Sequence, residues 1–116
     1  DFLHGSAKGG GILQNTAGEA IANVMVCARV WKQRELHPGV DWEDIFHQDS
    51  SKLVVYMSDQ THFSGPKACR VAGMRIRKVA ARLVDGNLRL QPEDLQSAID
   101  EDRAAGLVPC ALQLNY

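Results

Sequence analysis

Apolar side chains recur at helical spacing between Ala17 and Trp31, which predicts a helix over this stretch. Further apolar residues extend the stripe nearly around the helix axis: Ala22, Met25, Val26 and Cys27. A helix that is apolar on most sides is normally buried on most sides. Polar residues then lead to His37-Pro38-Gly39, a sequence that stops a helix. We therefore expect a mostly buried helix that ends near residue 37.

The run of residues 52–57 is continuous, apolar and rich in β-branched and aromatic side chains. Such a run is typical of a strand covered on both faces. The polar segment 58–64 follows it, at the end of the strand where open α/β sheets bind ligands.

The rest of the chain alternates between helices and strands. We expect a short amphipathic helix over residues 41–47, a helix that begins at Pro66 and ends at Gly73, and a strand over residues 74–81. A turn at Asp85-Gly86 should bring Leu88 and Leu90 beside Leu83. A helix from Pro92 to Gly106 and a strand over residues 107–114 complete the chain. This order predicts an α/β fold with a mainly parallel sheet flanked by helices.

The start of the first helix is a candidate anion site. Residues 9–11 are three glycines, Ile12 and Leu13 predict a brief buried extension, and residues 14–19 form a polar helix start. The first N–H groups of a helix lack intrahelical acceptors, and the helix dipole adds positive charge there. A phosphate is therefore well placed at Thr16, Ala17 and Gly18. An ordinary N-capped core helix explains the same residues.

The composition of the chain restricts the kinds of molecule that it is expected to bind. The 116 residues carry 13 basic and 14 acidic side chains, well interspersed, for a net charge of −1. This balance gives no electrostatic basis for binding nucleic acid or an anionic membrane, and favours small ligands or proteins. The sequence contains no stretch that could span a bilayer. Three widely spaced cysteines, expected as free core thiols, favour a reducing compartment, and we expect a cytoplasmic protein.

Several familiar motifs are excluded by spacing. Gln14 stands where a dinucleotide fingerprint needs its third glycine, and Lys8 is followed by Gly9 instead of the Ser or Thr of a phosphate-binding loop. The four histidines and three cysteines lack the spacing of metal ligands. A Ser-His or Cys-His nucleophile pair stays open, although no nucleophile elbow is present.

The chain also has the features of an internal piece of a longer protein. It opens on Asp1, carries a Phe2-Leu3 anchor, and stops at Tyr116 within an apolar run. Because a strand that is still apolar where the chain stops normally pairs with other strands, we expect neighbouring strands outside this sequence.

Four blocks of sequence resemble the group II pyridoxal-phosphate decarboxylases, most closely the aromatic-L-amino-acid (dopa, tyrosine, tryptophan) decarboxylases. They occur in the family's order and cover nearly the whole chain: residues 9–20 (GGGILQNTAGEA), residues 55–64 (VYMSDQTHFS), residues 85–87 (DGN) and residues 102–109 (DRAAGLVP). The resemblance implies that residues 1–116 are a fragment of the pyridoxal-phosphate-binding large domain of a fold-type I enzyme. It further implies a homodimer whose small-molecule substrate is an L-amino acid, expected to be aromatic.

The resemblance also implies roles for individual residues. Thr16, Ala17 and Gly18 match the turn that holds the cofactor phosphate, and His62 matches the histidine that lies against the pyridine ring and contacts substrate. The ring takes up the negative charge left on Cα when carbon dioxide departs.

The chain departs from the family pattern at Gly18, where the family has a hydroxyl that would contact the phosphate. We interpret Glu19 as a charge at the helix N-terminus and Asp59 as structural, because the family's carboxylate for the pyridine nitrogen comes from a later strand. None of the lysines matches the family's Schiff-base lysine: Lys8, Lys32, Lys52, Lys67 and Lys78. The isolated chain is therefore expected to be inactive.

Two alternatives stay open. One is an aromatic aldehyde synthase, which uses the same scaffold for oxidative deamination. The other is a non-catalytic truncated chain that binds only a ligand or a partner.

Overall fold

The computed structural model describes residues 11–114, and the expected Phe2-Leu3 anchor and the first two glycines of the triplet lie outside this range. Its elements are α1 (Ala17–Leu36), α2 (Trp42–Ile45), the 3-10 turn η1 (Ser50–Lys52), β1 (Leu53–Ser58), α3 (Ser64–Val71), β2 (Arg75–Val79), β3 (Arg82–Val84), β4 (Asn87–Arg89), α4 (Pro92–Ala104) and β5 (Val108–Gln113). Every predicted helix and strand is present, which confirms the α/β prediction.

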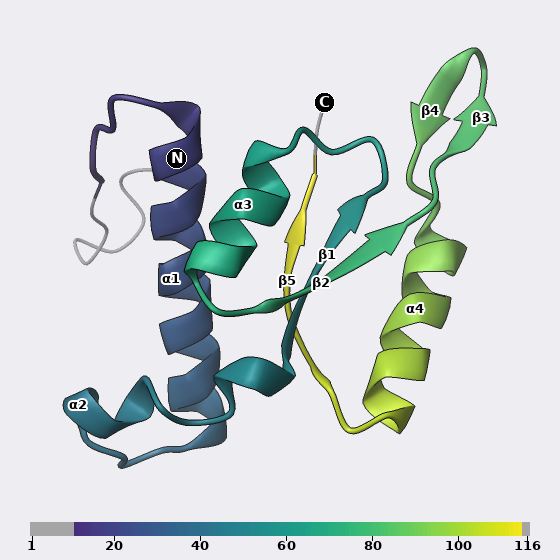
Figure 1. Ribbon diagram of the computed structural model, residues 1–116. Coiled ribbons are helices and arrows are strands. Elements are labelled where there is room, and N and C mark those ends of the chain that lie inside the picture. The colour runs from purple at the N-terminus through teal and green to yellow at the C-terminus, as the bar shows by residue number, and fades with distance from the viewer. Residues whose placement is uncertain (1–10, 115–116) are drawn as a thin grey trace.

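A three-stranded parallel sheet, in the order β2-β1-β5, forms the centre of the fold (Figure 1). The central strand β1 is buried along Leu53–Met57, as its continuous apolar run predicts. Its register with β5 shifts between Val54 and Val55, which places an irregularity inside the pairing. All three strands point toward one end of the molecule, where their carboxyl ends form a common edge.

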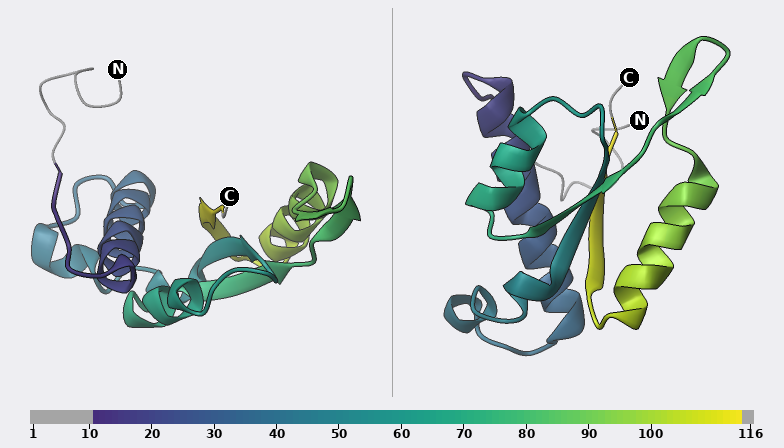
Figure 2. Two further views of the ribbon diagram at one scale, coloured as in Figure 1. Left: turned by 90° about the horizontal axis from the view of Figure 1, so that it is seen from above. Right: turned by 45° about the vertical axis from the view of Figure 1, so that its right-hand side comes forward.

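Helices cover both faces of the sheet. Met25 of α1 and Ala68, Cys69 and Ala72 around α3 pack on one face, against alternate residues of β1 such as Val55. The opposite face, formed by Val54, Tyr56 and Val79, packs against Ala98 of α4. Figure 2 shows the sheet between these helix layers.

The prediction that the first helix is buried on most sides is wrong. Only Met25, Val30 and Gln33 of α1 are buried, while Val24 is 62% and Trp31 74% exposed. Ile12 and Leu13, predicted as a buried extension, are 74% and 100% exposed. Apolar side chains on a helix indicate a face that packs against other residues, but within residues 11–114 only one side of α1 is packed in this way.

The cysteines also differ from expectation. Cys69 is buried and Cys110 half-buried, but Cys27 is exposed on α1. Burial raises the pKa of the Cys69 thiol to about 11 and also raises the pKa of Cys110, so both stay protonated near neutral pH.

The hairpin β3-β4 stands apart from the main sheet. Asp85 and Gly86 both have positive φ, 49° and 77°, as a two-residue hairpin turn requires. Leu83 pairs with Leu88 across the strands, as predicted. Leu90 lies one residue beyond β4 and packs against the core cluster that includes Ala98 of α4.

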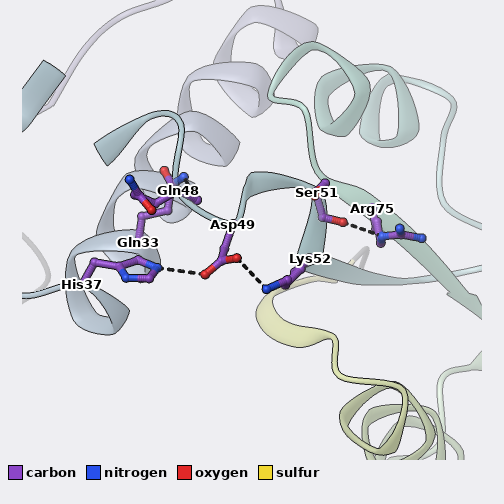
Figure 3. Close-up of polar contacts among 7 residues, drawn as sticks. All are labelled: Gln33, His37, Gln48, Asp49, Ser51, Lys52 and Arg75. Carbon is purple, nitrogen blue, oxygen red and sulfur yellow. Dashed lines mark hydrogen bonds and ion pairs between the residues drawn. The ribbon is translucent and has the colours of Figure 1, made fainter. Parts of the chain in front are cut away.

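Polar contacts fix the connection from α1 to β1 (Figure 3). The Asp49 carboxylate accepts hydrogen bonds from Lys52, at 2.8 Å, and from His37 Nε2, at 2.9 Å. The buried Gln33 side chain donates to the carbonyl oxygen of Gln48, and Arg75 Nε donates to the Ser51 carbonyl oxygen at 2.5 Å. Arg29 of α1 adds two contacts, since it donates to the carbonyl oxygens of Ala72 and Phe46. Together these contacts stabilise the end of the molecule opposite the carboxyl edge of the sheet.

Candidate functional site

Thr16 is the N-cap of α1, as the sequence predicts. Its backbone is extended (φ −136°, ψ 151°), and its hydroxyl oxygen accepts the N–H of Glu19 at 3.1 Å. The oxygen is the acceptor in this bond, and within residues 11–114 no acceptor is found for the hydroxyl hydrogen, which can therefore donate to a ligand. The exposed Glu19 adds an acid to the first turn, consistent with its interpretation as a helix N-terminal charge.

The next two residues supply backbone donors. Within residues 11–114, no acceptor is found for the N–H groups of Ala17 and Gly18. Within residues 11–114, a Cβ added to Gly18 would meet only Thr16 Oγ1, at 3.9 Å, so these residues leave room at the helix start. One hydroxyl and two N–H groups at the positive end of a 20-residue helix fit a phosphate dianion.

His62 lies in the loop between β1 and α3, and its side chain is exposed. Its Nδ1 is 2.9 Å from the Ser64 hydroxyl and accepts the Ser64 N–H at 3.3 Å. An N–H group can only donate, so this geometry requires an unprotonated Nδ1 and places the imidazole proton on Nε2. The ring also contacts Phe63, with centroids 4.4 Å apart. The Ser64 contacts favour the tautomer with its proton on Nε2, and no acceptor for this N–H group is found within residues 11–114.

The same end of the molecule holds both groups. Figure 1 places the start of α1 and the loop that carries His62 at the carboxyl edge of the sheet. The first half of α1 also borders Gln113 at the end of β5, because Ala20, Ile21 and Gln113 line one shallow pocket.

Gln113 and Gly65 pack together at the same edge of the sheet, and the sequence analysis did not single them out. Gly65, at the start of α3, is buried, and a Cβ placed on it would lie 2.6 Å from Gln113 Oε1 and 3.0 Å from the Thr61 methyl group. Oε1 of Gln113 and the Thr61 hydroxyl are buried without a hydrogen bond partner in the described part of the chain. The sequence features that could have pointed to this contact were a glutamine within an apolar run and a glycine within a helix.

Asp59 has the structural role that the sequence analysis gave it. Its carboxylate accepts the N–H of Ala81 at 3.0 Å and a contact from the Gln60 side chain at 3.2 Å. The Ala81 N–H, followed by Gln60, lowers the pKa of Asp59. Asp59 therefore joins the loop after β1 to the end of β2, and its charge stabilises that connection.

An open hollow of about 560 Å³ lies beside this loop, between the hairpin and the carboxyl edge of the sheet. Polar and apolar side chains share its lining, including Gln60, Arg89, Leu90 and Gln113. In the described part of the chain, no helix is both long and apolar enough to cross a membrane.

Comparison with known proteins identifies the class. Residues 1–114 match the pyridoxal-dependent decarboxylase conserved domain. The chain belongs to this family, whose cofactor is pyridoxal phosphate, and the resemblance drawn from the four sequence blocks is confirmed.

Individual relatives agree with this assignment. The chain is 43% identical over 105 residues to the aromatic-L-amino-acid decarboxylase of Drosophila lebanonensis, a match that covers 88% of this chain and 24% of that protein. It is 38% identical over 110 residues to the phenylacetaldehyde synthase of Arabidopsis thaliana, covering 93% of this chain and 21% of that protein. The chain thus spans less than a quarter of the length of either relative.

The fold is likewise found in a solved relative. The crystal structure of Oryza sativa TDC with PLP and tryptamine superposes with a TM-score of 0.72 at 34% identity, over 89% of this chain and 21% of that one. The predicted fold-type I segment, a parallel sheet flanked by helices, is therefore confirmed.

Proposed function

We propose that this chain is part of the cofactor-binding large domain of a decarboxylase that removes the carboxyl group of an aromatic L-amino acid. Its membership of the pyridoxal-dependent decarboxylase family supports the reaction class. The tryptamine in the rice structure and the name of the Drosophila relative support an aromatic substrate.

In this proposal the start of α1 holds the cofactor phosphate. The free hydroxyl hydrogen of Thr16 and the N–H groups of Ala17 and Gly18 donate to its oxygens, and the helix dipole adds to the attraction. Thr16 compensates for the hydroxyl that is missing at Gly18.

His62 lies against the cofactor ring and orients it. Ser64 fixes the imidazole through Nδ1, so the ring face and the Nε2–H group are presented together to cofactor and substrate. The bound cofactor supplies the electron sink for the negative charge that develops at Cα. His62 shields that centre from water and holds a proton at Nε2.

One observation supports the proposal most directly: two groups lie at the same edge of the sheet. One is the N-terminus of α1, whose first N–H groups have no acceptor within residues 11–114, and the other is His62, whose imidazole is oriented by Ser64. Neither group alone would indicate cofactor chemistry.

Replacement of His62 in the full-length protein tests the proposal. We expect His62→Ala to lower kcat by at least about tenfold while cofactor content stays near that of the wild type, because ring contact contributes about 1 kcal/mol and the phosphate dominates retention. His47→Ala, in the exposed turn after α2, is the matched control and should change neither. An unchanged kcat in His62→Ala would refute the role of His62.

An aromatic aldehyde synthase is the second candidate. The phenylacetaldehyde synthase of Arabidopsis thaliana matches this chain over 93% of its length, which supports it. Analysis of the products of the full-length enzyme separates the two reactions, because a decarboxylase releases an amine and an aldehyde synthase releases an aldehyde and ammonia.

Assembly and location complete the proposal. We expect a homodimer in the full-length protein, located in the cytoplasm, where the three free thiols stay reduced. The isolated chain is expected to lack activity, since none of its lysines matches the family's Schiff-base position.

A further inference from the structure

The loop that carries His62 is anchored on both sides of the histidine. It joins β1 to α3 at the carboxyl edge of the sheet (Figure 1). Thr61, just before the histidine, is 8% exposed, and its N–H donates to the Ser58 carbonyl oxygen at 3.0 Å. Gly65 is buried, and its N–H donates to the His62 carbonyl oxygen at 3.0 Å. The imidazole is therefore exposed while the backbone around it is held.

Gln113, at the end of β5, lies against this loop from a distant part of the sequence. A Cβ placed on Gly65 would be 2.6 Å from Gln113 Oε1 and 3.0 Å from Gln113 Nε2. The same point is 3.0 Å from the Thr61 methyl group. The carboxamide and Thr61 therefore meet over the Cα of Gly65, where any larger residue would take up their space.

Two polar atoms at this contact are unpaired. Gln113 Oε1 and Thr61 Oγ1 are both buried and have no hydrogen bond partner within residues 11–114. The first is an acceptor and the second belongs to a hydroxyl that can donate, so the two groups are complementary. A buried polar group left unpaired costs free energy, and a hydrogen bond between these two removes both costs.

Packing alone does not account for a carboxamide at this position. An aliphatic side chain of similar size, such as leucine, fills the space beside Gly65 without burying a polar atom. The carboxamide of Gln113 adds a directional group beside Thr61, and Thr61 directly precedes the histidine. A directional contact fixes the position of a loop better than apolar contact does.

We propose that Gln113 is a positioning residue for His62. Its carboxamide accepts a hydrogen bond from the Thr61 hydroxyl and packs over Gly65, and this contact fixes the loop from which the imidazole projects. Ser64 orients the ring itself through Nδ1, whereas Gln113 holds the backbone that carries the ring. The inference rests on the proposed role of His62 beside the cofactor.

Carbon-13 NMR of the full-length protein without cofactor tests the proposal independently of activity. With histidine labelled at Cδ2, and at a pH where the imidazole is neutral, the chemical shift distinguishes the two tautomers. The signal of His62 is identified by its absence in His62→Ala. Gln113→Leu and Thr61→Val should each move this signal away from the value of the Nε2–H tautomer, because a displaced loop weakens the Ser64 contact. Gln96→Leu, at an exposed glutamine of α4, is the matched control and should leave it unchanged.

Turnover of the full-length enzyme provides a second measurement. Gln113→Leu should lower kcat about three- to tenfold with little change in KM, because a small displacement of the imidazole slows the reaction. Thr61→Ser keeps the hydroxyl and should retain most of the wild-type kcat. In a protein that already carries His62→Ala, Gln113→Leu should have no further effect on kcat, since a positioning residue acts through the group that it positions.

Thermal unfolding of the cofactor-free variants reports the hydrogen bond itself. Removal of a paired buried hydroxyl lowers the melting temperature, whereas removal of an unpaired one raises it. We expect Thr61→Val to lower the melting temperature, and to lower it less when residue 113 is already leucine. The same measurement shows whether each variant folds, and Thr61→Val decides the outcome if Gln113→Leu does not fold.

Three results would overturn the proposal: a His62 signal that stays at its wild-type position in Gln113→Leu and Thr61→Val, an equal effect of Gln113→Leu on kcat with and without His62, or a rise in melting temperature in Thr61→Val. His62→Ala alone separates this inference from the proposed function. An unchanged kcat in that variant refutes the role of His62 in the reaction, while the NMR signal still decides whether Gln113 positions the imidazole.

Discussion

The carboxamide of Gln113 occupies the space that a side chain at Gly65 would need. A Cβ at residue 65 would lie 2.6 Å from Oε1 and 3.0 Å from Nε2 of Gln113. The contact joins the last strand of the sheet to the turn that carries His62, since the Gly65 N–H also donates to the His62 carbonyl oxygen at 3.0 Å.

Gly65→Ala should therefore destabilise the fold. Alanine in place of glycine normally favours a helix by up to about 1 kcal/mol. Here, however, the Gln113 carboxamide must rotate out of its buried position and the Thr61 methyl group, 3.0 Å from the added Cβ, must also move, and overpacking of this kind costs about 1–3 kcal/mol. We expect a net loss in the free energy of unfolding, measured by urea denaturation. The double variant Gly65→Ala with Gln113→Ala should recover stability relative to Gly65→Ala, because the space is then free. Equal losses in the two would show that Gln113 is not the obstacle.

Gly18→Ser should tighten cofactor binding in the full-length protein. The added hydroxyl supplies one charge-assisted hydrogen bond to the phosphate, of about 1.5–3 kcal/mol, or roughly ten- to a hundredfold in affinity. The described part of the chain has room for it, since there a Cβ at residue 18 contacts only Thr16 Oγ1, at 3.9 Å.

Gly18→Ala is the control for Gly18→Ser. Thermal stability of the cofactor-free protein should rise with both substitutions, because both remove a glycine from the first helical turn. Cofactor affinity should rise with serine only. Equal affinities for serine and alanine would mean that the phosphate does not lie at residues 16–18.

Asp49→Asn should change how stability depends on pH. Lys52 and then His37 hold the pKa of the Asp49 carboxyl below its usual value of 3.8. A depressed pKa contributes stability that is present above this value and is lost as the pH falls below it. Asparagine also tolerates the left-handed backbone at this position (φ 49°), so the substitution changes mainly the charge.

We therefore expect Asp49→Asn to be less stable than wild type at neutral pH, with the difference closing below about pH 4. Urea unfolding across this range measures it, and Asp44→Asn, at an exposed acid of α2, serves as the control. A difference that persists unchanged at low pH would show that the ion pairs around Asp49 do not contribute.

Tyr56→Phe should reduce the fall in the free energy of unfolding that the wild type shows at alkaline pH. The Tyr56 hydroxyl is buried without a hydrogen bond partner in the described part of the chain. Burial first, and then the neighbouring Asp102 carboxylate, raise the pKa of this phenol above its usual value of 10.0. A raised pKa contributes stability below pH 10 that is lost as the pH rises, because only the unfolded chain ionises readily.

Near pH 8, Tyr56→Phe should be within about 1 kcal/mol of the wild type. Near pH 11 the phenylalanine variant should be the more stable of the two, measured by urea unfolding. The same dependence on pH in both proteins would contradict the raised pKa.

The sequence predicted the parts of the fold that local patterns determine. The continuous apolar run at 53–57 predicted a strand buried on both faces, and Thr16 predicted a helix start that the N-cap confirms. The hairpin followed from Asp85-Gly86, since few residues adopt positive φ at two successive positions.

Contacts between distant segments were not predictable. The exposure of Val24 and Trp31 depends on what covers α1, which the periodicity of α1 does not contain. The contact between Gly65 and Gln113 depends on the packing of α3 against the end of β5, and the hollow at Arg89 depends on where the hairpin lies. The roles of Thr16, Ala17, Gly18 and His62 stay predictions that the experiments above test.

The position of the hairpin has a consequence for how such a protein can diversify. β3 and β4 have no buried residue, yet β4 forms one wall of the hollow. Substitutions at Leu88 or Arg89 therefore change the hollow at little cost in folding free energy, because surface changes usually stay within about 0.5 kcal/mol. Selection can therefore vary the shape and charge of this surface while the buried strand β1 preserves the architecture.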